Sequence, residues 1–126
     1  MAHDARSAYL ANTVATANPA RLLVMLCDRL ALDVQRAVEA QERGDHLGAR
    51  RDLLHAQDIV VELRATLRVD AWDGAPQLAA LYDWLFTNLV RANTQRDVAI
   101  TRACQPIVAE LADTWRQAAL TTLQAS

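Results

Sequence analysis

The chain has 126 residues and a net charge of -2, and 52% of its residues are apolar while 22% are charged. This length fits one domain with its own core, and the balance is that of a globular rather than a disordered protein. All 13 basic residues are arginine, which excludes Schiff-base lysines, lysine general bases and the P-loop lysine. Charges of both signs are spread along the chain, so no nucleic-acid partner is expected.

The N-terminal part of the chain predicts an arm followed by a long helix. Residues 1–17 carry no sustained apolar stripe, and they are expected to form a short helix or a loosely held arm. Asn18-Pro19 predicts a helix start, because Asn caps free N–H groups and Pro is tolerated at the first helical position. Apolar residues at three- and four-residue steps then predict a helix to about Arg43, which Gly44 ends.

Three further helices are predicted after this one. Asp45 can cap the second helix, whose apolar seam continues to Leu67. Residues 69–75 break the pattern, and Pro76 opens the third helix in its first turn. Asp97 can cap the fourth helix.

These four amphipathic helices predict an all-α fold, an antiparallel four-helix bundle with a short N-terminal helix or arm. We expect a single domain over residues 1–126, with the arm in 1–17 and the bundle in 18–124. Pro106 lies well inside the last helix, where it removes one backbone hydrogen bond and predicts a kink. The apolar run Leu22–Cys27 is too short for a signal-peptide core or a membrane span, so a cytosolic protein without membrane insertion is expected.

The chain offers little catalytic chemistry. It contains no G-x-S-x-G, no Gly-rich phosphate loop and no H-E-x-x-H, so neither enzyme activity nor a cofactor is expected. Cys27 and Cys104 lack metal-type spacing and are expected to be buried, reduced thiols. Asp52-Leu-Leu-His55 is a single echo of the paired Glu-x-x-His motifs of di-metal bundles. It is interpreted as a solvated ion pair, and no metal is expected.

Four stretches of the chain carry sequence motifs that bear on its function. They are Tyr9 to Leu26, which contains Thr16-Ala17-Asn18-Pro19; Ala56 to Leu63 with Leu67 after it; Leu78 to Asp83 followed by Leu89 to Asn93; and Trp115. Together they span residues 9 to about 116 in order, which is nearly the whole chain. They resemble the signatures of the flagellin export chaperone family, FliS.

The resemblance implies a cytosolic chaperone that binds the C-terminal helical region of flagellin, prevents premature polymerisation and assists delivery to the flagellar export apparatus. The resemblance implies no cofactor. It also implies that the arm, residues 1–17, lies over part of the binding surface and moves when flagellin arrives. The expected partner-binding residues are apolar or aromatic, namely Tyr9, Leu10, Val14, Leu22, Met25, Leu26, Tyr82, Leu85 and Leu89. For most of those in the helices, a place in the bundle core is the competing interpretation.

The chain departs from the family's pattern at three places. Cys27-Asp28-Arg29 stands where the family usually has Tyr-Asp-Gly, His55 stands where a lysine is common, and Pro106 interrupts a helix expected to be free of kinks. These changes predict different helix packing but leave the fold intact. With these changes, the expected client is either flagellin or a divergent relative of flagellin.

Two alternative functions stay open at this stage. One is a structural or adaptor bundle that self-associates through an apolar groove as a homodimer. The other is a phosphorelay bundle that uses His55 as a phosphate acceptor. Ala56, Gln57 and Asp58 follow this histidine, and they are not the small and basic residues that such a site carries.

Overall fold

The computed structural model of the chain describes residues 19–125, including the side chains of residues 19–121. Within this range lie four α-helices, α2 (Pro19–Glu42), α3 (His46–Thr66), α4 (Ala75–Thr94) and α5 (Val98–Ala125). The all-α fold expected from the sequence is therefore confirmed. The predicted arm lies outside the described residues, and the division into 1–17 and 18–124 stays a prediction.

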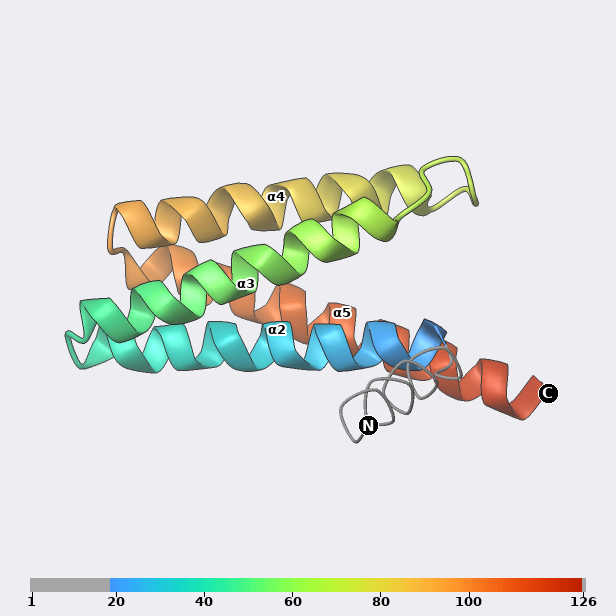
Figure 1. Cartoon of the computed structure of the whole chain (residues 1–126), viewed down its shortest axis with the longest axis horizontal. Helices are drawn as coiled ribbons and strands as arrows, with labels where there is room; N and C mark the ends of the chain where they lie inside the picture. The colour runs from blue at the N-terminus through green and yellow to red at the C-terminus, as the bar shows by residue number, and fades with distance from the viewer. Residues whose placement is uncertain (1–18, 126) are drawn as a thin grey trace, which may run out of the picture.

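The four described helices form an antiparallel bundle in which each packs against two others. α2 lies against α3 and α5, α3 lies against α4, and α4 lies against α5. Consecutive helices run in opposite directions (Figure 1). We call the end with the turns 43–45 and 95–97 the turn end, and the end with the connection 67–74 the loop end. α5 has 28 residues against 20 in α4, and its last turns project past the bundle at the loop end (Figure 1).

The core follows the three- and four-residue apolar spacing of the helices. Its buried members include Cys27, Leu30 and Val34 of α2; Leu53, Ala56, Val60 and Leu63 of α3; Tyr82, Leu85 and Leu89 of α4; and Cys104, Val108 and Leu111 of α5. The two cysteines are free and fully buried, as predicted. Burial raises the pKa of Cys27 to about 12 and the pKa of Cys104 to about 11. From residue 19 to 125, no helix is long and apolar enough to span a membrane.

Two helices end at the turn end with the same hydrogen-bond pattern. After α2, Gly44 has a φ of 75°, and the N–H of Asp45 donates 2.8 Å to the carbonyl of Ala40. After α4, Arg96 has a φ of 51°, and the N–H of Asp97 donates 3.2 Å to the carbonyl of Ala92. Both helices therefore end on a residue in the left-handed region, which glycine adopts freely and arginine does not.

The predicted helix starts at Asp45, Pro76 and Asp97 are confirmed, whereas the predicted cap Asn18 lies outside the described residues. The N–H of Gly48, three residues on, donates 2.9 Å to Oδ1 of Asp45, and the N–H of Ala99, two residues on, donates 2.9 Å to Oδ1 of Asp97. Pro76 is the second residue of α4, where its missing N–H leaves no helical hydrogen bond unmade. Pro106 lies inside α5, which continues on both sides of it, and the kink before it stays a prediction.

Candidate partner-binding surfaces

An apolar groove lies between α4 and α5 at the loop end of the bundle. Its volume is about 500 Å³, and we call it the α4–α5 groove. Glu110 and Thr114, both exposed, supply its charged and hydroxyl groups. The lining consists of Trp72, Leu78, Leu81, Ile107, Glu110, Leu111, Thr114, Trp115 and Ala118.

Helical spacing explains why apolar side chains face one another across this groove. Ile107, Leu111 and Trp115 follow at four-residue steps on α5 and therefore share one face. Leu78 and Leu81, three residues apart on α4, form the opposite wall. α4 and α5 share the least extensive of the bundle's helix–helix interfaces, so their apolar walls stay open to solvent. Such a groove can accept the apolar face of an amphipathic helix.

Two tryptophans join this groove to a smaller hollow. Trp72, from the connection 67–74, is 51% exposed, and Trp115 of α5 is half-buried. Both also line a hollow of about 220 Å³ that contains Tyr82. Burial raises the pKa of Tyr82 to about 12, against the opposing effect of a hydrogen bond from the Trp115 indole N–H. Tyr82 is therefore a neutral phenol held beneath the two tryptophans.

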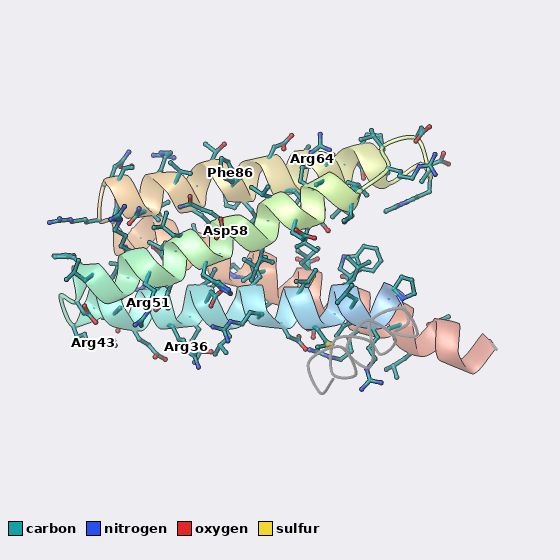
Figure 2. All side chains as sticks on the ribbon, viewed as in Figure 1. Arg36, Arg43, Arg51, Asp58, Arg64 and Phe86 are labelled. Carbon is teal, nitrogen blue, oxygen red and sulfur yellow. The ribbon has the colours of Figure 1, made fainter. Side chains whose placement is uncertain are left out.

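A second groove lies between α3 and α4, with a volume of about 530 Å³. Val61 and Phe86 present exposed apolar surface there, and Tyr82 also lines it. Arg64 Nε lies 3.2 Å from Asp83 Oδ1, so an exposed ion pair crosses from α3 to α4 beside the apolar surface. Figure 2 shows Arg64 on α3 and Phe86 on α4. This groove is more polar at its rim than the α4–α5 groove.

Three of the predicted partner-binding residues lie on the first turns of α2. Leu22 is 45% exposed and Met25 is 61% exposed, so neither is a core residue. Leu26 is half-buried and packs against the core. α2 begins at the loop end, which is also the end of the bundle with the α4–α5 groove. These residues therefore add apolar surface near that end.

The other predicted residues divide between the core and the undescribed arm. Tyr82, Leu85 and Leu89 are buried, so they can act on a partner only as support beneath a surface. Tyr9, Leu10 and Val14 lie outside the described residues. The sequence interpretation missed the α5 wall of the α4–α5 groove. The four-residue steps on α5 were the signal, but that spacing alone does not distinguish a groove wall from core.

Comparison with known proteins decides the family. The family model described as flagellar protein FliS matches residues 1–122. The chain belongs to the FliS family. The flagellar secretion chaperone FliS of Bacillus subtilis (strain 168) is 31% identical over 112 residues, which cover 89% of this chain and 84% of that protein. The flagellar secretion chaperone FliS of Escherichia coli (strain K12) is 27% identical over 111 residues, covering 86% and 82%.

A solved structure bears out the fold of this FliS chain. It is described as the crystal structure of a flagellar chaperone from bacteria, and it matches with a TM-score of 0.75 at 21% identity. The match covers 96% of this chain and 99% of that one. FliS proteins are secretion chaperones and not enzymes, so this chain is a flagellar secretion chaperone, and the expectation that it is not an enzyme is confirmed.

Two departures from the FliS pattern converge on one buried carboxylate. The side chain of Asp33, on α2, is 1% exposed; its Oδ1 lies 3.2 Å from Arg29 Nε, and its Oδ2 hydrogen-bonds His55 Nδ1 on α3. The interpretation of Asp52 and His55 as a solvated pair is wrong. Asp52 is buried, and its Oδ1 lies 3.5 Å from Arg51 Nε. His55 turns across the α2–α3 interface instead, because the buried carboxylate there needs a donor.

Across the described residues, no group of three or more His, Cys, Asp or Glu side chains could hold a metal ion.

Proposed function

We propose that this FliS chain binds the C-terminal helical segment of flagellin in the α4–α5 groove. In this proposal it acts in the bacterial cytosol, keeps flagellin from polymerising prematurely and assists its delivery to the flagellar export apparatus. The observation that carries the proposal is the open apolar groove with its two tryptophans. An apolar surface of this kind marks an interaction site, because exposing it to water is unfavourable.

The chemistry of the groove suits an amphipathic client helix. Apolar client side chains at three- and four-residue spacing would lie between the α4 wall and the α5 wall. Trp72 and Trp115 are of the residue type that contributes most to protein interfaces. Each Å² of apolar surface buried contributes about 25 cal/mol before ordering costs are subtracted. A client that folds only on binding loses much of that gain as entropy, which suits a chaperone that releases its cargo.

The exposed residues of α2 would extend this surface. We propose that Leu22 and Met25 contact the client directly, since both are exposed at the loop end of the bundle. Leu26 would support them from behind, because it is half-buried against the core.

The buried and undescribed residues have different proposed roles. Tyr82 would hold Trp115 in place through the indole hydrogen bond, and Leu85 and Leu89 would keep α4 seated as the groove's wall. The arm residues from Tyr9 to Val14 would lie over the apolar surface in the free protein and move when the client arrives.

The test is a calorimetric titration of the full chain with the C-terminal helical segment of flagellin from the same organism. We expect saturable one-to-one binding with a negative heat-capacity change. Two variants carry the same substitution on exposed alanines of α5, Ala118→Glu in the groove and Ala103→Glu outside it. Ala118→Glu should weaken binding about tenfold or more, because it places a carboxylate among apolar side chains. Ala103→Glu should leave binding unchanged.

Three outcomes would count against the proposal. Equal binding by both variants would place the client elsewhere on the bundle, and Val61→Glu would then test the α3–α4 groove. An absence of binding by a folded chain would remove flagellin as the client. A homodimer whose formation competes with the peptide would favour the self-associating adaptor.

A further inference from the structure

A pocket at the turn end is the strongest feature that the proposed function does not use. Its volume is about 330 Å³, and it lies between the start of α3 and the end of α4. We call it the turn-end pocket; it is lined by Gln41, His46, Leu47, Ala49, Arg50, Leu53, Asn93, Thr94 and Arg96. No acidic side chain is among these residues. The α4–α5 groove lies at the opposite end of the bundle.

The pocket holds basic side chains without acidic partners. Within the described residues, neither Arg50 nor Arg96 forms an ion pair, whereas the neighbouring arginines at the turn end do. Arg43 Nη2 lies 3.4 Å from Asp45 Oδ2. Arg102 Nη2, on α5, lies 3.2 Å from Glu42 Oε1 at the end of α2. Asp45 and Glu42 are thus engaged by other arginines, Asp97 caps α5 through the N–H of Ala99, and no acidic side chain lines the pocket beside Arg50 and Arg96.

Two of the other polar side chains that line the pocket, Gln41 and Thr94, form hydrogen bonds within the bundle. Gln41 Nε2 donates 3.3 Å to the carbonyl of Ala92, and its Oε1 accepts 2.6 Å from the Thr101 hydroxyl. The Thr94 hydroxyl donates 3.1 Å to the carbonyl of Val90. Arg50 and Arg96 are both exposed to solvent at the pocket, and guanidinium groups bind carboxylates strongly.

The backbone at Arg96 supplies a second, independent observation. Its φ of 51° is a conformation in which a side chain is unfavourable, and the matching turn after α2 uses Gly44 there. A turn of this type gains nothing from arginine. Strain of this kind tends to occur where a side chain has a functional role, and the Arg96 side chain lines the pocket.

The pocket also has an apolar side. Leu47, in the first turn of α3, is 83% exposed, and Leu53 is fully buried at the pocket's inner wall. A bare inorganic anion would leave Leu47 exposed. A ligand with a carboxylate next to an aliphatic side chain would use both sides of the pocket.

We propose that the turn-end pocket docks an acidic, leucine-containing segment of a partner protein. Carboxylates of that segment would bind Arg50 and Arg96, and its aliphatic side chain would cover Leu47. Because the pocket and the α4–α5 groove lie at opposite ends, the chaperone can hold a client and this partner together. The docking site does not depend on the identity of the client.

The test uses the full chain and two synthetic peptides, acetylated and amidated Glu-Leu-Glu-Glu-Leu and its Gln-Leu-Gln-Gln-Leu analogue. Titration followed by NMR should shift the backbone amides of residues 46–50 and 93–96 with the acidic peptide only. Arg50→Gln and Arg96→Gly should each weaken binding about tenfold, the loss expected when one charge-assisted hydrogen bond is removed. Arg36→Gln is the matched control, because Arg36 is exposed on α2 away from the pocket (Figure 2). It should leave binding unchanged.

Several results would overturn the proposal. Equal shifts with the Gln analogue would show that charge recognition is absent. If Arg36→Gln weakened peptide binding equally, binding would depend on the overall charge of the protein surface and not on the turn-end pocket. Saturable shifts with inorganic phosphate but none with the acidic peptide would make the pocket a small-anion site. The Arg96→Gly variant should remain folded, so a loss of binding in it cannot be assigned to unfolding.

Discussion

Exchanging the residue types at two equivalent turns should change stability in opposite directions. Gly44 and Arg96 end α2 and α4 with the same hydrogen-bond pattern, at φ values of 75° and 51°. A Cβ added at Gly44 would meet nothing within 4 Å, so Gly44→Ala tests backbone strain alone. We expect Gly44→Ala to destabilise the protein and Arg96→Gly to stabilise it.

The magnitude follows from two opposing terms. A non-glycine residue in the left-handed region costs about 1–2 kcal/mol. Glycine loses more entropy on folding, which offsets about 0.4–1 kcal/mol of that difference. Each substitution should therefore change the free energy of unfolding by about 0.5–1 kcal/mol. For an m value of about 2 kcal/mol/M, the urea midpoint should move by about 0.3–0.5 M.

Urea denaturation followed by far-UV circular dichroism measures both changes. Arg96→Ala is the control, because it removes the arginine side chain and keeps the strained φ; its midpoint should stay near that of the parent protein. A lower midpoint for Arg96→Gly would refute the reasoning, since the arginine side chain would then contribute more than the strain costs. Equal gains for Arg96→Ala and Arg96→Gly would place the effect in the side chain and not in the backbone.

Three further predictions concern the ionisable groups. Asp33→Asn should lower the free energy of unfolding, measured by urea denaturation, by about 1–3 kcal/mol because it weakens two charge-assisted contacts. The control is Asp58→Asn at an exposed position, which should change the free energy of unfolding by less than about 0.5 kcal/mol. The hydrogen bond from the Gly48 N–H lowers the pKa of Asp45 below its ordinary 3.8. The ionised Asp45 therefore stabilises the protein fully above pH 3.8, and this stabilisation is lost as the pH falls further. Asp45→Asn keeps the helix cap and should make the free energy of unfolding depend less on pH in this acidic range. Because burial raises the pKa of Cys27 to about 12, this thiol should react with a disulfide reagent near pH 8 only after unfolding, and fast labelling of the native chain would contradict its burial.

Much of the fold could be predicted because its signals are local. Asp45 and Asp97 cap helices through their own neighbours, and Pro76 and Gly44 mark a helix start and a helix end by backbone geometry. Arg96 gave no such signal, because nothing in its side chain indicates a left-handed residue. The α2–α3–α4–α5 order of packing follows from short connections between antiparallel helices.

The surfaces were harder to predict because they depend on how far apart the helices lie. Leu22 and Met25 share the apolar spacing of the core residues on α2, yet both are exposed, since none of the other three described helices covers that face at its first turns. Tyr82 stands in the same kind of stripe and is fully buried. The partner of His55 could not be found from spacing, because Asp33 lies on another helix.

The carboxylate of Asp33 also constrains how this sequence could have diverged from its relatives. An acid buried between α2 and α3 needs at least one cation, and here Arg29 and His55 share that role. A relative with glycine at position 29 would depend on a basic residue at position 55. Among sequences that keep an acid at position 33, columns 29 and 55 of an alignment should therefore vary together, and losing both cations at once should coincide with losing the acid.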